Sequence, residues 1–260
     1  MAGASLVEFA LRRERLLVVA GISLVVIGSW AYLLAGAGMM QDMGTALLPM
    51  SSAPWTPGQL LVVVVMWVVM MAAMMLPSAA PMVLFHAAVA RQRRGGTAAG
   101  MASAAFVLGY LALWSVFSVG ATLLQYTLER LALLSPMMQT TSILLAGAIL
   151  VGAGVYQWTP LKRICLQSCR SPFALVMGHW RDGFAGSFAM GLLHGATCLG
   201  CCWLLMLLLF IGGVMNLGWI AGIAVFIAVE KIVPAHTAVS RAAGVLLVAW
   251  GVATWWAAAA

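Results

Sequence analysis

The chain alternates long apolar runs with short polar segments. A helix that crosses a lipid bilayer needs about 20 mostly apolar residues, because the hydrocarbon layer is about 30 Å thick. Seven runs reach or approach this length, at residues 16–37, 60–90, 98–125, 139–158, 184–211, 214–233 and 242–258. The pattern therefore predicts an all-α protein, a polytopic transmembrane helical bundle of about seven spans in a single domain over residues 1–260.

The first apolar run has two interpretations. It follows Arg12, Arg13 and Arg15, and the sequence at residues 35–37 (AGA) resembles the cleavage site of a signal peptide. The apolar stretch is longer than the core of a usual signal peptide, and this favours a retained helix.

The longest polar segments lie near residues 38–58 and 159–183, where we expect an external and a cytoplasmic loop. Prolines punctuate both segments, at Pro49, Pro54, Pro57, Pro160 and Pro172.

Composition supports a membrane location. The chain is 64% hydrophobic and carries only 13 basic and 6 acidic side chains. A soluble protein cannot bury so much apolar surface, whereas spanning helices satisfy their backbone groups internally and need apolar exteriors. The basic residues lie in short clusters between apolar runs, so they serve as orientation signals and lipid contacts and do not indicate nucleic-acid binding.

The basic residues also predict the orientation. With seven spans and a cytoplasmic N-terminus, every Lys and Arg except Arg130 falls on the cytoplasmic side. The reverse orientation would invert this bias, which the positive-inside rule forbids. We therefore expect a multi-pass protein of the cytoplasmic (inner) membrane of a bacterium.

Methionines gather in the second run. The chain has 18 methionines, twice its number of phenylalanines. Met66, Met70 and Met74 are four residues apart, as are Met71 and Met75, so their thioethers would form one broad stripe on a helix. The stripe has two interpretations, since methionine is both a soft metal ligand and a filler of irregular helix contacts.

The fifth run carries a second ladder of ligand-forming side chains. Met190, His194, Cys198 and Cys202 follow one another at intervals of four residues, with Cys201 beside them. Sulfur ligands select soft ions such as copper(I), and imidazole adds a borderline ligand. If the second and fifth runs are neighbours, a file of sulfur atoms crosses the bilayer. The candidate metal ligands are Cys198, Cys201, Cys202, His194, Met70, Met71, Met74, Met75 and Met190.

Two further groups lie near the ends of this file. The candidates for external metal capture are Met39, Met40 and Met43, and those for cytoplasmic metal delivery are Cys165, Cys169 and His179. The cytoplasm keeps thiols reduced and available as ligands. The alternative is a solvated loop with two incidental cysteines.

Glu230 and Lys231 end the sixth run. They are interpreted either as an ion pair at the membrane interface or as a gate that contains a proton-coupling carboxylate.

Four segments resemble one protein family. They are Trp67–Pro77 (WVVMMAAMMLP), Lys162–Pro172 (KRICLQSCRSP), Gly191–Met206 (GLLHGATCLGCCWLLM) and Met215–Trp219 (MNLGW) followed by Glu230-Lys231. The family consists of uncharacterised bacterial integral membrane proteins described as predicted metal-binding. The resemblance covers about residues 60–235 and is specific in the MM-x2-MMLP and HG-x2-CLGCCW motifs. It implies a metal-binding core formed by His194, Cys198, Cys201, Cys202, Met70, Met71, Met74 and Met75, and it leaves the metal and its fate open.

Three functions remain open after these observations. The favoured one is binding of a soft metal, copper(I) before any other soft ion, for transport or copper handling. The second is a membrane thiol oxidoreductase that uses Cys201-Cys202 or Cys198-Cys201 as its redox pair. The third is a structural or assembly subunit of a membrane complex.

The favoured function sets the expected partners. They are the lipid bilayer and a copper chaperone or a metalloenzyme under assembly, with no nucleic acid. The sequence contains no phosphate-binding Walker motif and no recognisable catalytic triad, so we expect no enzyme activity.

Overall fold

The computed structural model describes the backbone of residues 2–36, 40–43, 46–49, 55–94, 96–135 and 138–259, and the side chains of 16–36, 55–93, 98–135, 138–171, 173 and 176–258. Its elements in chain order are α1 (Ala2–Leu34), β1 (Met40–Met43), β2 (Ala46–Pro49), α2 (Pro57–Arg94), α3 (Gly96–Arg130), α4 (Ile143–Tyr156), α5 (Pro160–Arg170), α6 (Pro172–Gly178), α7 (Gly183–Leu207), α8 (Leu209–Gly212), α9 (Leu217–Ile232) and α10 (His236–Ala259).

The long helices coincide with predicted apolar runs. Five segments are long and apolar enough to cross a membrane, and they are Leu16–Leu34, Pro57–Arg93, Ala98–Arg130, Gly183–Gly212 and His236–Ala258. Helices α4 and α5 meet at a bend of 65° and count as a sixth span if the pair is taken together. Helix α9 has 16 residues and falls below the length of a full span. The helical bundle is confirmed, with five or six such spans among the described residues.

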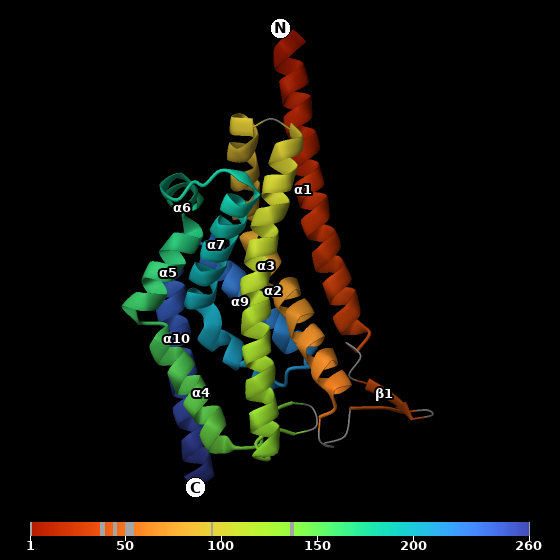
Figure 1. Ribbon diagram of the computed structural model, residues 1–260. Helices are drawn as coiled ribbons and strands as arrows, with labels where there is room; N and C mark the ends of the chain where they lie inside the picture. The colour runs from red at the N-terminus through yellow and green to blue at the C-terminus, as the bar shows by residue number, and fades with distance from the viewer. Residues whose placement is uncertain are drawn as a thin grey trace.

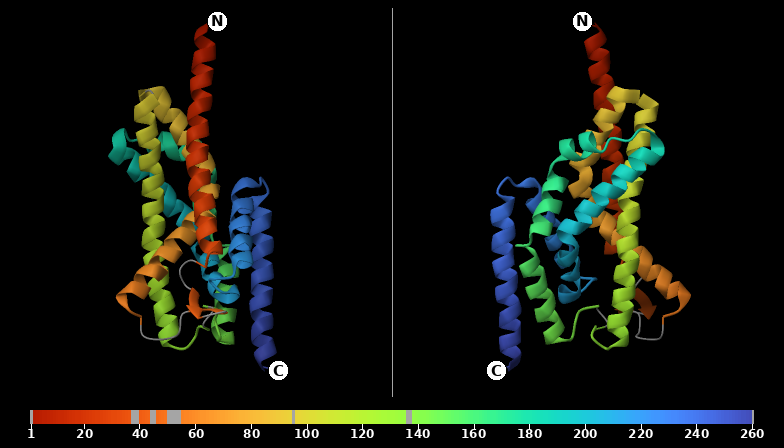
Figure 2. Two further views of the ribbon diagram at one scale, coloured as in Figure 1. Left: turned by 90° about the vertical axis from the view of Figure 1, so that its right-hand side faces the viewer. Right: turned by 60° about the vertical axis from the view of Figure 1, so that its left-hand side comes forward.

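The bundle is organised around α3. Helix α3 packs against α2 on one side and α7 on the other, α1 covers α2, and α5 lies on α7. Helix α10 pairs with α4 at the edge of the bundle (Figures 1 and 2). The two termini lie at opposite ends of the molecule (Figure 1).

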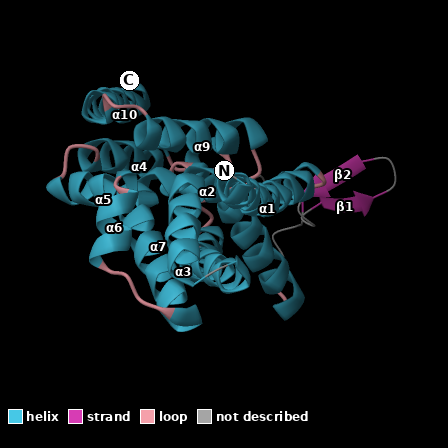
Figure 3. Ribbon diagram, turned by 90° about the horizontal axis from the view of Figure 1, so that it is seen from above, coloured by secondary structure: helices cyan, strands magenta, loops and turns pink. Residues whose placement is uncertain are grey.

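Both predicted loops contain regular structure. Strands β1 and β2 pair antiparallel, Met40 with Pro49 and Met43 with Ala46, and they lie beside the end of α1 (Figure 3). The prediction of a loop over 159–183 was wrong, because α5 and α6 occupy most of it. The Thr159 side chain accepts the Lys162 N–H and Pro160 follows it, which is a favourable start for a helix.

The two ladders predicted from spacing lie in the same buried core. Met70, Met71, Met74 and Met75 of α2 are at most 2% exposed, and so are the three cysteines of α7. One apolar cluster contains all seven side chains together with residues of α3 and α9. Helix α3 therefore joins two ladders that lie on either side of it.

Candidate metal centre

The thiols of α7 are held by their own helix. Cys201 and Cys202 both donate to the carbonyl oxygen of Cys198, each at 3.0 Å. The spacing of three and four residues places these side chains over one turn, as the sequence predicted. All five cysteines of the chain are free thiols.

A fourth thiol reaches this group from α5. Cys169 donates to the Thr197 hydroxyl at 3.6 Å, and its side chain packs against the buried cluster that contains Cys198 and Cys201. The sequence placed Cys169 in a separate cytoplasmic delivery group, whereas the structure brings it into the cluster on α7. We call Cys169, Cys198, Cys201 and Cys202 the thiol cluster.

Cys165 is one turn before Cys169 on the same helix. It is half-buried and faces α7 at Gly200, where an added Cβ would lie 2.7 Å from its sulfur. The predicted C-x3-C pair therefore lies along the contact between α5 and α7. The third predicted delivery residue, His179, is exposed beyond the end of α6.

Polar side chains from three other helices surround Cys198. The Lys231 ammonium donates to the Cys198 sulfur at 3.0 Å and to the Ser78 hydroxyl at 2.8 Å. The Tyr110 hydroxyl lies 3.2 Å from the same sulfur and donates to the Met75 carbonyl oxygen, also at 3.2 Å. Ser78 donates to that carbonyl oxygen as well. Helices α2, α3, α7 and α9 thus meet at one sulfur atom.

Lys231 does not form the ion pair with Glu230 that the sequence suggested. Glu230 pairs instead with Lys162 of α5 at 2.8 Å and accepts from Ser240 of α10 at 2.6 Å. Successive side chains on a helix point about 100° apart, since a turn holds about 3.6 residues, so the two neighbours face different helices. The interpretation of Glu230 and Lys231 as an ion pair was therefore wrong.

The sequence analysis missed two residues around the thiol cluster, Tyr110 and Ser78, and named the third, Lys231, only together with Glu230. A charged residue in an apolar run is the signal that identifies Lys231 as functional. No comparable signal marks Tyr110 or Ser78, because their importance depends on which helices are neighbours.

The remaining predicted ligands are His194 and Met190 of α7 and the methionines predicted for external capture. His194 is 2% exposed and stacks on Tyr110 with ring centroids 5.4 Å apart, while Met190 lies in a second buried cluster. Of the predicted capture residues, Met39 lies outside the described residues. Met40 and Met43 belong to β1, where the backbone alone is described.

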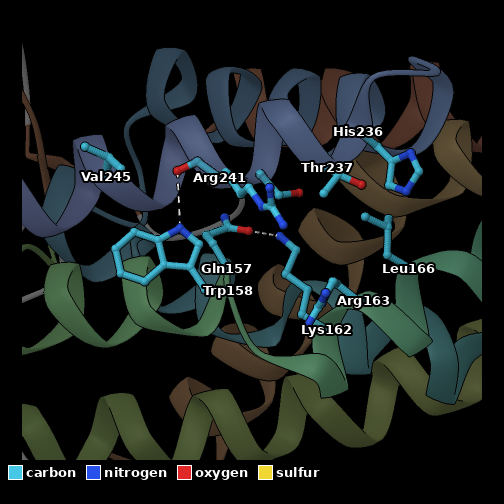
Figure 4. A pocket seen from close by; sticks show the side chains of 10 residues that line it. Gln157, Trp158, Lys162, Arg163, Leu166, His236, Thr237, Arg241 and Val245 are labelled. Carbon is cyan, nitrogen blue, oxygen red and sulfur yellow. Dashed lines mark hydrogen bonds between the residues drawn. The ribbon is translucent and has the colours of Figure 1, made fainter.

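A cavity of about 350 Å³ lies on the other side of α5. It opens beside the buried Lys162 and is lined by Arg163, His236 and Arg241 among others (Figure 4). No member of the thiol cluster lines this cavity. The candidate metal centre is therefore a packed interior site and not the floor of this cavity.

The thiol cluster has the chemistry of a soft-metal site. Copper(I) accepts low coordination numbers and prefers sulfur ligands, and four thiols are gathered here beside a cation. Among the side chains that the structure describes, no three or more of His, Cys, Asp and Glu are placed to hold one ion together. Cys201 and Cys202 instead donate to the Cys198 carbonyl and Cys169 donates to Thr197, so metal binding requires these side chains to rotate.

Comparison with known proteins agrees with this chemistry. No curated protein and no solved structure matches the chain. The model of the PpoB2 family, described as a copper chaperone, matches residues 64–254, a region that includes the thiol cluster, Tyr110 and Lys231. Because this match covers well over half of the sequence, the chain belongs to the PpoB2 copper chaperone family.

Proposed function

We propose that this chain binds copper(I) at the thiol cluster within a membrane-embedded helical bundle and passes the ion to a protein partner. The observation that carries the proposal is the packing of Cys169 from α5 against the buried thiols of α7, beside Lys231. Family membership supports copper as the ion. Other soft ions fit the same donors.

Charge balance supports this assignment. Copper(I) held by two thiolates has one net negative charge, and a buried charge is costly unless it is paired. Lys231 supplies a positive charge 3.0 Å from the Cys198 sulfur. The centre can therefore hold a bis-thiolate copper(I) ion without leaving an unpaired charge in an apolar region.

The site is better suited to transfer than to permanent storage. Its thiols come from two different helices, and those of Cys201 and Cys202 can exchange a backbone carbonyl for the ion. Exchange of one sulfur ligand at a time would let the ion move to a partner's thiol. The proposal assigns no catalytic residue and no chemical reaction beyond this ligand exchange.

The basic residues support an inner-membrane location with a cytoplasmic N-terminus. The start of α1, the end of α2, the start of α3 and the start of α7 all lie at one end of the molecule (Figure 1). These segments contain or adjoin Arg12, Arg93 and Arg181. Positively charged segments stay on the cytoplasmic side, so this end faces the cytoplasm.

The test is copper(I) binding by protein purified in detergent under anaerobic, reducing conditions. We expect Cys198→Ser and Cys169→Ser to weaken binding, measured by competition with a copper(I) chelator. Cys165→Ser is the matched control on the same helix, and it should have a much smaller effect because Cys165 faces Gly200.

The same experiment separates the competing functions. Unchanged copper(I) binding when Cys169, Cys198, Cys201 and Cys202 are all serine would refute the proposal. A reversible disulfide between two cluster thiols, formed with a quinone and lost with a reductant, would favour the oxidoreductase. An X-ray absorption spectrum with copper–sulfur scattering that disappears in the serine variant would support copper handling.

A further inference from the structure

His86 of α2 is a buried polar side chain without a hydrogen-bond partner. It is completely inaccessible to solvent, and neither ring nitrogen has a partner. Buried polar groups in folded proteins are nearly always satisfied, so each exception calls for a physical explanation such as a bound ion. The sequence analysis did not select His86, because a single histidine on an apolar helix is common.

The surroundings of His86 explain why it lacks a partner. Its ring packs between Phe106 of α3, at 4.7 Å between centroids, and Trp180, at 5.4 Å. The same region contains the buried side chains of Val83 and Val176. These neighbours have no acceptor or donor placed to serve the imidazole, so its nitrogens stay unsatisfied at a cost in stability.

Two thioethers lie in the same cluster as these apolar side chains. Met82 is one helical turn before His86 on α2, so both side chains lie on the same face. Met190 of α7 belongs to the same buried cluster as Met82, and both are at most 2% exposed. Met190 is likewise one turn before His194. The chain thus has two Met-x3-His pairs, one on α2 and one on α7, whose methionines belong to one cluster and whose histidines both lie near Phe106 of α3.

A row of aromatic rings connects this region to the thiol cluster. Phe106 lies between His86 and His194, with a centroid 6.0 Å from the latter. His194 stacks on Tyr110, and the Tyr110 hydroxyl reaches Cys198. The Nδ1 atom of His194 also lacks a partner. His86 is therefore separate from the thiol cluster but linked to it by stacked side chains.

We propose that His86, with the thioethers of Met82 and Met190, forms a second copper(I) site. The donors are one imidazole nitrogen and two sulfur atoms, a neutral set that suits a soft monovalent ion and lacks the hard oxygen ligands that other biological cations prefer. Because these donors are all neutral, the site holds copper(I) more weakly than negatively charged thiolates do.

The position of the second site gives it a role in transfer. Trp180 closes the row of rings, with the Arg93 guanidinium 5.0 Å from its ring centroid. This end contains the end of α2 and the start of α3 (Figure 1). The second site therefore lies between the thiol cluster and the basic end of the bundle. Its role as an intermediate binding site during copper transfer rests on the proposed function, whereas its ability to bind copper(I) does not.

The test starts from a chain with all five cysteines replaced by serine. Titration with copper(I) against a chelator should show one remaining equivalent, and X-ray absorption should show mixed nitrogen and sulfur scattering. Adding His86→Leu should remove this equivalent or weaken it by at least the roughly tenfold that loss of a supporting group costs a metal site. Adding His236→Leu instead, at a histidine that lines the cavity beside α5, should leave this equivalent unchanged.

A second background guards against misfolding of the five-serine chain. In the chain with all its cysteines, His86→Leu should lower the copper(I) stoichiometry by one and leave the copper–sulfur signal of the thiolates intact. Met82→Leu with Met190→Leu should act in the same way while preserving the packing volume.

The outcomes distinguish this inference from the proposed function. Equal copper(I) binding with and without His86→Leu in either background would overturn the second site. Equal stoichiometry in the native and five-serine chains, with His86→Leu abolishing it, would support the second site and refute the thiol cluster. Loss of all binding in a folded five-serine chain would overturn the second site alone.

Discussion

Lys231 is the residue on which the charge of the thiol cluster depends. Its ammonium contacts both Cys198 and Ser78. We predict that Lys231→Met, which keeps the length of the side chain without its charge, weakens copper(I) binding by about 1.5–3 kcal/mol, the contribution of a hydrogen bond to a charged group. This corresponds to roughly a 10- to 150-fold higher dissociation constant, measured by chelator competition. Lys231→Arg should recover part of the affinity, and an unchanged constant for Lys231→Met would contradict the charge-balance model.

At the scale of single residues, sequence spacing predicted relationships within a helix and missed those between helices. The intervals of three and four residues correctly placed Cys198, Cys201 and Cys202 on one face. They gave no information on Tyr110, which matters because α3 stands between α2 and α7. They gave no information either on the contact of Cys169 with Thr197, since it depends on how α5 folds back onto α7.

The contact between α3 and α7 depends on two glycines. A Cβ added at Gly109 would overlap the carbonyl oxygen of Phe188, and one added at Gly191 would overlap that of Phe106. Small residues let helix backbones approach closely in membranes. We predict that Gly109→Ala destabilises the protein by about 1–3 kcal/mol, because backbone atoms cannot rotate away as a side chain would.

The control lies on the same helix. Gly120 of α3 has no atom within 4 Å of an added Cβ. Gly120→Ala should leave the thermal unfolding temperature in detergent unchanged or raise it, since alanine favours a helix by up to about 1 kcal/mol over glycine. Equal unfolding temperatures for the two variants would show that this crossing is not closely packed.

The buried ion pair between Lys162 and Glu230 joins three helices. These side chains are 1% and 2% exposed, and Ser240 of α10 also donates to the carboxylate. We predict that Glu230→Gln destabilises the protein by about 3–5 kcal/mol, because it leaves the Lys162 charge buried without its partner. Thermal unfolding of the purified protein measures the effect.

Two comparisons check this interpretation. The double variant Lys162→Met with Glu230→Gln should recover much of the lost stability, because it removes both charges. Arg163→Met changes the exposed neighbour of Lys162 and should stay within about 0.5 kcal/mol of the native chain. A double variant less stable than either single one would mean that the pair has a further role.

At the scale of elements, the prolines explain the main error of the sequence analysis. Pro57 and Pro160 were interpreted as marks of loops, whereas each begins a helix. Proline fits the first turn of a helix, where its missing N–H would have no partner. Thr159 before Pro160 was the available sign of a helix start.

At the scale of the whole molecule, hydropathy predicted the helical bundle and left the number of crossings uncertain. Apolar runs show where a helix can cross a membrane, because exposed backbone groups are excluded from lipid. They do not show whether a short or bent helix does so. The uncertain elements are α9 and the pair of α4 and α5, whose 65° bend divides one apolar run from a more polar helix.

The number of crossings determines on which side the chain ends, and this can be measured. Helix α9 has 16 residues and is about 24 Å long at about 1.5 Å per residue, somewhat short of a hydrocarbon layer about 30 Å thick. The C-terminus nevertheless lies at the opposite end of the molecule from the N-terminus (Figure 1). We therefore predict seven crossings, with one face of α9 packed on the bundle and the bilayer locally thinned around it.

Reporter fusions test this topology in intact bacteria. Alkaline phosphatase, which is active outside the cytoplasm, should be active when fused after Ala258 or within residues 131–135. A fluorescent protein that matures only in the cytoplasm should be bright when fused at residue 95. A phosphatase that is inactive after Ala258 but active after residue 131 would mean an even number of crossings. The positive charges near Lys231 and Arg241 would then lie outside, against the positive-inside rule, and the thiol cluster would need a different route to the cytoplasm.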